Sequence, residues 1–199
     1  PTLIDFSFKT GLIRVNKLET SKITTCYAMF RSCTNLVYAK ITNVSESREL
    51  QGMFMDCSKL ETIEGVELWD TSKNTSCAAM FSGCKKLKNI DVSNLNMSKV
   101  QAAGAMFRYC HELTDVDLSK WRTSNLQYPS GMFTDCKGLT KLDVSSFDVE
   151  CAGGAAQFMS GCTKLTEVNL SNWILSEKNS IRLDSSANKL SVAYFFNKT

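Results

Sequence analysis

The chain has 199 residues, of which 43% are hydrophobic and 22% charged, so it is long enough to bury a core and has the composition of an ordinary soluble domain. Its 23 basic and 20 acidic residues give a net charge of +3 and form no long run of one sign, which argues against nucleic-acid binding. No apolar run approaches the roughly 18 residues of a membrane-spanning helix. We expect no nucleic-acid partner and no direct insertion into a membrane.

The first 22 residues are expected to form a degenerate first rung or cap. They keep the apolar residues Val15 and Leu18 and a Thr-Ser turn at residues 20–21. They lack the bulky pair and the cysteine that recur in the rest of the chain. A terminal unit of a repeat array must be capped against water, so a weakened motif is expected there.

Residues 23–176 contain a regular internal repeat. Its most regular column is a cysteine followed three residues later by a leucine, and a bulky pair, usually Met-Phe, stands shortly before each cysteine. The periodic cysteines are Cys33, Cys57, Cys84, Cys110, Cys136 and Cys162. A further column contains Trp69, Leu95, Trp121, Phe147 and Trp173. The period of about 26 residues is in the range that predicts an array of stacked units.

Each unit is predicted to contain a helix followed by a strand. Val100, Ala103, Phe107 and Cys110 have the spacing of one helix face, and Ser98 would be a suitable N-cap. The segment "LTDVDLS" (113–119) alternates apolar and polar residues as a short strand does, and "LKNIDVS", "LTKLDVS" and "LTEVNLS" are its counterparts.

The predicted fold class is an α/β repeat of about six helix-strand units. Strands stack about 4.8 Å apart and helices about 8 to 10 Å apart, so we expect a curved leucine-rich-repeat-like solenoid with a parallel strand sheet on its concave face. After Trp173 the motif ends, and residues 177–199 are expected to form a C-terminal cap in which Leu190, Val192 and Tyr194 alternate as in a closing strand. We expect residues 1–199 to form a single solenoid domain.

The repeated unit resembles a known family. Segments such as "MFRYCHELTDVDLSKWRTSNL" and "MFSGCKKLKNIDVSNLNMSKV" are similar to the BspA-like surface-protein repeat, the DUF285 type, over residues 12–176. The family's "DTS" turn is replaced here by "NMS", "RTS", "DVE" and "ILS". The resemblance implies a leucine-rich-repeat-like fold and display on a bacterial or protist cell surface, where family members are proposed to bind components of a host or a neighbouring cell. Phage-encoded relatives also occur.

The nine cysteines allow a functional and a structural interpretation. They could ligate a metal, form a redox site or form disulfides, or they could pack as small buried hydrophobes. Packing is favoured because the periodic cysteines would lie on helices too far apart for disulfides, and Cys26 and Cys77 share their face. Cys151 lies outside this register and is the thiol that we expect to be exposed. For the aromatic column, a place in the core is favoured over a stacking surface for sugars or bases.

An acidic column stands between the inward-facing residues of successive strands. Like charges about 5 Å apart in water cost on the order of 1 kcal/mol, so the column either binds a cation or is balanced by local hydrogen bonds and lysines. Residues that vary between rungs on the same face would contact a partner. The candidate partner-binding face contains Tyr38, Lys40, Thr62, Glu64, Asn89, Asp91, Thr114, Asp115, Asp117, Lys141, Asp143, Glu167 and Asn169.

The sequence contains no motif that indicates catalysis, a cofactor or a metal centre. Its only histidine, His111, replaces Ser58, Lys85, Lys137 or Thr163 of other rungs and is expected at an exposed helix end. The preferred hypothesis is a non-enzymatic recognition or adhesion module that binds a protein or glycan through its strand face, at a microbial cell surface or outside the cell. The alternative is a structural or assembly subunit, virion-associated or in a surface layer.

Overall fold

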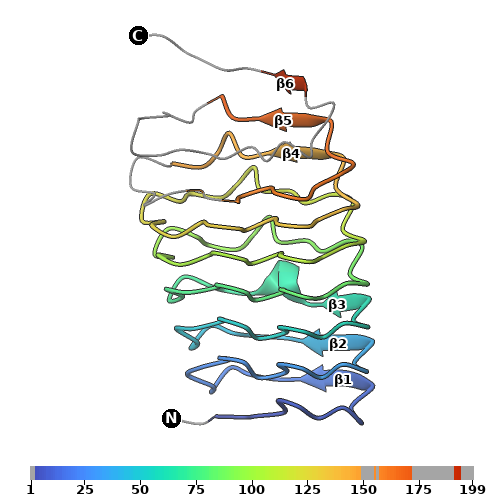
Figure 1. The fold of residues 1–199 in the computed structure, drawn as a ribbon. Coiled ribbons are helices and arrows are strands. Elements are labelled where there is room, and N and C mark those ends of the chain that lie inside the picture. The colour runs from blue at the N-terminus through green and yellow to red at the C-terminus, as the bar shows by residue number, and fades with distance from the viewer. Residues whose placement is uncertain (1–2, 149–154, 156, 172–190, 194–199) are drawn as a thin grey trace.

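The computed structural model describes residues 3–148, 155, 157–171 and 191–193, and these form a stack of rungs, one for each repeat of the sequence. The stack rises from the N-terminus at the bottom of Figure 1 to the last strand at the top. The strands are β1 (Arg14–Leu18), β2 (Tyr38–Ile41), β3 (Thr62–Glu64), β4 (Lys141–Asp143), β5 (Glu167–Asn169) and β6 (Ser191–Ala193). A short 3-10 turn, η1 (Val66–Leu68), follows β3.

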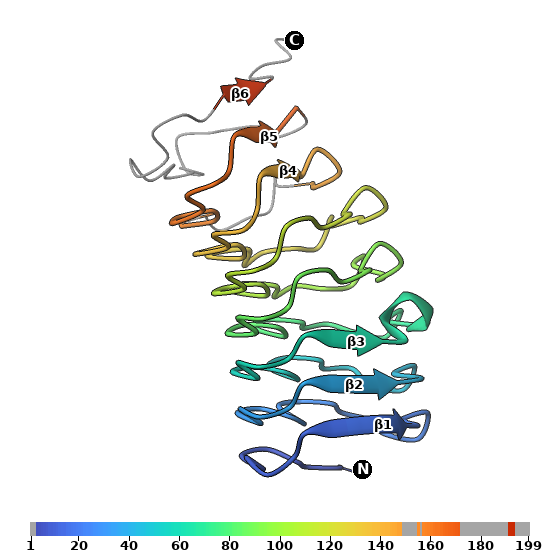
Figure 2. The same ribbon diagram turned by 90° about the vertical axis from the view of Figure 1, so that its right-hand side faces the viewer.

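Parallel pairing joins the rungs on two sides of the core. The strands form two sheets, in the orders β1-β2-β3 and β4-β5-β6, and equivalent positions of successive rungs face each other, as in Tyr38 opposite Thr62. A second ladder of single parallel bridges joins Glu49, Ser76, Ala102 and Tyr128. Figure 2 shows the strand side of the stack, with compact turns at one end of each strand.

The predicted helices are wrong. The described residues contain no α-helix, and the five residues before each periodic cysteine, which we call the turn segments, form consecutive turns. Alternate amides of these segments bond to the next rung, while the amides between them bond to the third preceding residue: the Phe54 N–H donates to the Met80 carbonyl at 2.9 Å, and the Phe107 N–H donates to the Met132 carbonyl at 2.9 Å. These donors are therefore not available for the bonds to the fourth preceding residue that define a helix.

The turn segments fail to become helices because their backbone repeatedly enters the left-handed region. Residues with positive φ stand immediately before the bulky pair and two residues after its second member, so no right-handed stretch continues. These residues are Ala28, Ser32, Gly52, Asp56, Ala79, Gly83, Ala105, Tyr109, Gly131, Asp135, Gln157 and Gly161. At Gly83 the conformation and a close neighbour both require glycine, because a Cβ would lie 2.5 Å from Oδ1 of Asp56.

The predicted leucine-rich-repeat-like architecture is wrong for the same reason. The expected curvature, with strands on the concave face, depended on packed helices that are spaced more widely than strands. Here, backbone ladders with strand pairing lie on both sides of a rung. Of the four predicted strand segments, the two around residues 141–143 and 167–169 form strands. The segments at 87–93 and 113–119 do not.

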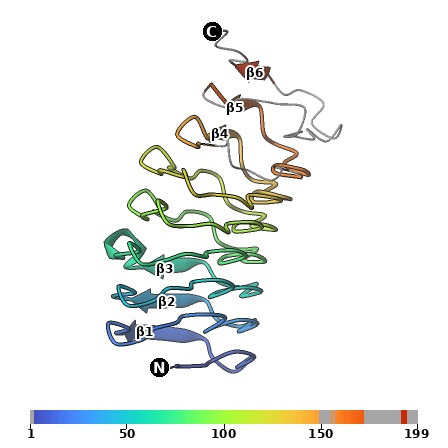
Figure 3. The same cartoon turned by 90° about the vertical axis from the view of Figure 1, so that its left-hand side faces the viewer.

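Columns of identical side chains fill the core. Six phenylalanine rings stack from rung to rung at centroid distances of 5.2 to 6.0 Å, namely Phe6, Phe30, Phe54, Phe81, Phe107 and Phe133. The aromatic column is also buried: Trp69 and Trp121 each donate from Nε1 to a carbonyl of an earlier rung at 2.9 Å. Trp173 lies outside the described residues. Figure 3 shows the stack from the side opposite to that seen in Figure 2.

Each periodic cysteine occupies a fixed position beside the phenylalanine column. Its thiol lies 3.0 to 3.2 Å from the carbonyl of the phenylalanine one rung earlier, as Cys110 does with Phe81, and donates a weak hydrogen bond to it. The eight described cysteines are buried and free, so they pack as part of the core. The prediction that the cysteines pack in the core had been argued from the spacing of helices, and that argument was wrong. Cys151 lies outside the described residues.

Candidate functional site

The strand side of the stack carries all thirteen candidate partner-binding residues, and none of them is buried. Pairing sets neighbouring candidates side by side: Lys40 faces Glu64, Lys141 faces Glu167, and Asp143 faces Asn169. They stand on a core that is nearly identical from rung to rung. The face therefore combines a constant scaffold with a variable outer surface.

A groove of about 560 Å³ crosses this face near the C-terminal rungs. We call it the acidic groove, and its lining residues are Asp115, Val116, Asp117, Leu118, Ser119, Lys141, Leu142, Asp143, Glu167 and Asn169. Six of the thirteen candidates thus meet in one place. The other seven do not line this groove.

Four carboxylates and one ammonium group line the acidic groove. Lys141 Nζ lies 3.0 Å from Glu167 Oε2, and the Asn169 amide donates to Asp143 Oδ2 at 3.0 Å. Asp115 and Asp117 make no ion pair with any described residue. The groove is therefore net negative: Asp115, Asp117 and Asp143 have no ion-pair partner among the described residues, and Lys120 attracts Asp117 only from beyond ion-pair distance.

The acidic column has a local structural role. Asp117 Oδ1 accepts the Ser119 N–H at 2.9 Å, and Asp143 Oδ1 accepts both the N–H and the hydroxyl of Ser145. The Ser119 bonds lower the pKa of Asp117; at Asp143 burial raises the pKa, but the bonds from Ser145 and Asn169 outweigh it. Such Asx turns end the strand segment of the rungs that contain Asp91, Asp117, Asp143 and Asn169. Asp117 is exposed, so its carboxylate can hold the turn and still contact a partner.

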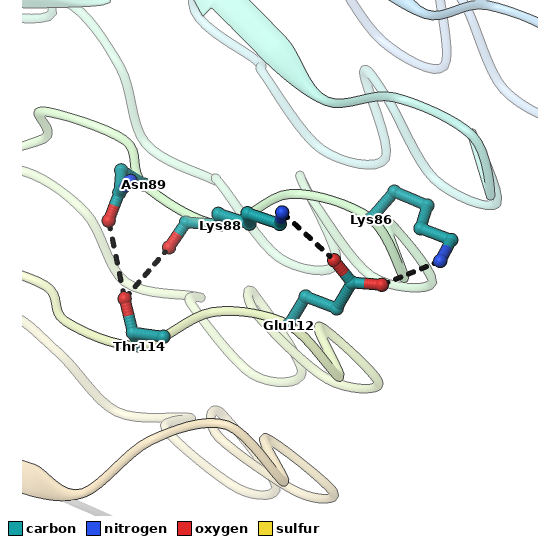
Figure 4. Close-up of polar contacts among 5 residues, drawn as sticks. All are labelled: Lys86, Lys88, Asn89, Glu112 and Thr114. Carbon is teal, nitrogen blue, oxygen red and sulfur yellow. Dashed lines mark hydrogen bonds and ion pairs between the residues drawn. The ribbon is translucent and has the colours of Figure 1, made fainter.

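A second groove, of about 470 Å³, lies nearer the N-terminus on the same side, and ion pairs join several of its lining residues. Lys86 Nζ lies 2.6 Å and Lys88 Nζ lies 3.8 Å from the two carboxylate oxygens of Glu112, as the dashed lines in Figure 4 indicate. Thr114 Oγ1 donates to Asn89 Oδ1 at 3.3 Å. Lys86 is the main cause of the lowered pKa of Glu112. In this groove the charges largely satisfy one another.

Sequence reasoning missed Lys86 and Glu112. Each follows a periodic cysteine by two residues, where the predicted helix was thought to end. The available signal was their opposite charge at equivalent positions of adjacent rungs, 26 residues apart. Once equivalent positions are placed side by side, this spacing indicates an ion pair across rungs.

The candidates on the first rungs are also paired. Lys40 Nζ lies 3.2 Å from Glu64 Oε2, and the guanidinium of Arg14 lies 4.3 Å from the centre of the Tyr38 ring. Hydrogen bonds from Tyr38 and then Lys40 lower the pKa of Glu64. Tyr38, Lys40 and Glu64 line neither groove.

No catalytic constellation is evident in the described part of the chain. His111 is half-buried and packs edge-to-face on Tyr109, at 6.3 Å between ring centres. Burial, then Lys137 and Lys85, lower its pKa. Within residues 3–148, 155, 157–171 and 191–193, no three His, Cys, Asp or Glu side chains are grouped to hold a metal. That the protein has no enzymatic activity stays a prediction.

The same described ranges contain no helix that could cross a lipid bilayer.

Comparison with known proteins identifies a family. Neither the curated proteins nor the solved structures gave a match. The family model described as "Mycoplasma protein of unknown function, DUF285" matches residues 5–116 and 48–173, which together cover most of the chain. The matched region contains the cysteine, phenylalanine and leucine columns that build the stack. The chain therefore belongs to the DUF285 family.

Proposed function

We propose that this protein is a non-enzymatic recognition module that binds a partner through the acidic groove. A protein or a glycan could occupy such a surface, and the charge of the groove favours a protein that presents lysine or arginine side chains. The resemblance of the repeat to BspA-like surface proteins supports display at a microbial cell surface. No cofactor is part of the proposal.

The observation that carries the proposal is that Asp115 and Asp117 line the groove without an ion pair to any described residue. In the second groove, Glu112 already forms ion pairs with two lysines, whereas Asp117 has only the more distant attraction of Lys120. Asp117 occupies the position equivalent to Asp91 and Asp143 of the adjacent rungs. Like charges about 5 Å apart, the spacing of stacked strands, repel in water by roughly 1 kcal/mol. A cationic partner would remove this repulsion and gain new ion pairs, so binding should weaken as salt is added.

Conservative substitutions test the groove without disturbing the turns. Asp115→Asn and Asp117→Asn remove charge but keep an oxygen that can accept the Val116 and Ser119 amides. Asn96 makes the same type of turn with Ser98, which shows that asparagine is compatible with it. The matched control is Glu46→Gln with Glu49→Gln, which removes the same charge from positions outside both grooves.

The probe is a fluorescent peptide of alternating lysine and serine, measured by anisotropy at low and at physiological salt. We expect the Asp115→Asn, Asp117→Asn protein to bind at least about tenfold more weakly than wild type, and the control protein to change less than about twofold. Equal losses in both proteins would mean that only net charge matters, and the groove proposal would then be wrong.

A further inference from the structure

The residue directly after each periodic cysteine lies at a corner of its rung, between the turn segment and the strand segment. In five successive rungs its amide donates to the carbonyl two residues earlier, as Lys85 does to Gly83 at 2.9 Å, so these corners share one backbone form. In Figure 2 the corners lie among the compact turns from which the strands start. We call these residues the corner column: Thr34, Ser58, Lys85, His111, Lys137 and Thr163.

Three adjacent members of the corner column are basic. Lys85, His111 and Lys137 belong to the rungs whose phenylalanine rings lie 5.6 and 5.4 Å apart, so the basic groups repeat at about this spacing along the stack. Burial, then Lys137 and Lys85, lower the pKa of His111, and Asp135 opposes them. Serine and threonine occupy the column in other rungs, so the corner itself does not require a charge.

The carboxylates nearby leave most of this positive charge without an ion pair. Lys85 makes no ion pair with any described residue, although Asp56 lies one rung earlier. Lys137 Nζ lies 3.9 Å from Asp135 Oδ1. Glu112, the next carboxylate along this side, is already engaged by two lysines of the second groove. The corner therefore keeps a net positive charge.

Tyr109 adds an aromatic surface and a further cation to the same corner. Its ring is 36% exposed, and the edge contact described above joins it to His111. The guanidinium of Arg108 lies 4.6 Å from the ring centre and donates to Tyr109 Oη at 2.8 Å, and it makes no ion pair with a described residue. Cations bind acid groups, and an exposed tyrosine ring packs against the apolar face of a sugar.

We propose that Lys85, His111 and Lys137, with Arg108 and Tyr109, bind a linear polysaccharide that carries one acid group per sugar and runs along the stack. A pyranose ring is about as long as one rung is high, so successive acid groups meet successive rungs. An extended acidic peptide repeats its side chains on one face at roughly 6.6 Å and matches this spacing less well. None of these residues lines the acidic groove, so this surface goes beyond the function proposed above.

The probe is a fluorescently labelled hexamer of galacturonic acid, and its methyl ester, which has the same sugars without the charge, is the comparison. In anisotropy titrations at low salt, the acid hexamer should bind the wild-type protein at least about tenfold more tightly than the ester. Equal binding of the two hexamers, or no binding of the acid hexamer below about 1 mM, would overturn the proposal.

Variants of the protein locate the surface. Lys85→Gln with Lys137→Gln should weaken binding of the acid hexamer at least about tenfold. Lys22→Gln with Lys99→Gln removes the same charge from exposed positions outside the column and should change binding less than about twofold. Equal losses in both variants would overturn the proposal. The Lys85, Lys137 variant should still bind the lysine-serine peptide within about twofold of wild type, which separates this test from that of the acidic groove.

His111 reports on the surface directly because it is the only histidine of the chain. Bound acid groups favour the imidazolium form, so the pKa of His111 followed by NMR should rise with the acid hexamer and stay constant with the ester. Binding should tighten at least about threefold from about pH 7.5 to about pH 5.5, and His111→Gln should remove this gain. An unchanged pKa of His111, or a hexaglutamate peptide that binds as tightly as the acid hexamer, would overturn the assignment.

Discussion

The turn segments and the strand face of each rung differ in how strongly their residues are buried and in how much they vary between rungs. The turn segments are largely buried and nearly the same in every rung, with a bulky pair, a thiol directly after them and a fixed alternation of backbone handedness. The strand face keeps a buried residue at every second position but varies the exposed residues between them, such as Asn89, Asp115 and Lys141. The constant, buried residues of both regions therefore build the core, and the exposed residues of the strand face are free to diversify.

The largest effect expected on the turn side is unfolding at alkaline pH. Burial raises the pKa of Cys26, Cys33, Cys57, Cys77, Cys84 and Cys110, in the case of Cys77 to about 12 from an ordinary value of 9.0. The unfolded chain loses these protons near pH 9 while the folded chain keeps them. The stabilisation is complete below pH 9 and is lost as pH rises toward the folded value.

The measurement is the free energy of unfolding in urea from pH 7 to 10.5 with a phosphine reductant present. Each fully buried thiol should contribute a loss of about 1.4 kcal/mol per pH unit above 9. Cys77→Ala should reduce the slope by one thiol's share, although it also lowers stability at pH 7. An unchanged slope in this variant would contradict the buried thiol column.

The next effect concerns the phenylalanine column. Phe107 is fully buried between Phe81 and Phe133, so Phe107→Ala should leave a cavity and lower the free energy of unfolding by about 3 to 5 kcal/mol. His111→Ala, four residues later and half-buried, should cost less than about 1 kcal/mol. Similar losses in urea denaturation would show that the two residues do not differ in burial as described.

Glycine substitutions test the turn geometry more narrowly. Gly83→Ala should cost about 1 to 3 kcal/mol, because φ is +77° and the new Cβ would meet Asp56. Gly11→Ala is the control, since a Cβ there meets nothing within 4 Å, and it should change stability by less than about 1 kcal/mol. Thermal unfolding of both variants gives the comparison. A loss at Gly11 as large as that at Gly83 would contradict the assignment.

Much of the stack could be predicted from the sequence. The period, the cysteine and leucine columns and the buried tryptophans follow from self-similarity, because a residue that must fit its equivalents in neighbouring rungs recurs at that spacing. The prediction of helices was wrong because consecutive turns, in which an amide donates a hydrogen bond to the carbonyl of the third preceding residue, give the same spacing of apolar residues as a helix. The overlooked signal was Asp56, Gly83, Asp135 and Gly161, two residues after the second member of the bulky pair, since glycine and aspartate adopt positive φ more readily than most residues. Ser32 and Tyr109 hold the same position in other rungs and give no such signal.

The candidate site was predictable as a face but not as a groove. Alternation along each strand segment indicated which residues are exposed, and Asp115, Asp117 and Lys141 were chosen on that basis. Which of them meet in a hollow depends on backbone irregularity that period-two patterns do not encode. One feature of the first rung was also not predicted: Phe6 belongs to the phenylalanine column although the bulky pair and cysteine are missing there.

The smallest effects are expected on the strand face. Asp115→Asn and Asp117→Asn keep their turn acceptors and should change the free energy of unfolding by less than about 0.5 kcal/mol at pH 7. Their effect should appear in peptide binding alone. If urea denaturation showed a loss of about 2 kcal/mol or more, a size typical of buried rather than surface positions, these carboxylates would belong to the scaffold. The strand face would then share the structural role of the turn segments.

The most direct test of the account is the combined substitution Ala28→Gly, Ala79→Gly and Ala105→Gly, followed by urea denaturation. These alanines have φ of 49°, 53° and 55°, and Gly52 and Gly131 occupy the equivalent positions of other rungs. Glycine relieves left-handed strain of about 1 kcal/mol per site and loses roughly as much in unfolded-state entropy, so we expect equal or slightly higher stability. A loss of about 3 kcal/mol, the cost of three glycines inside helices, would contradict the turn architecture.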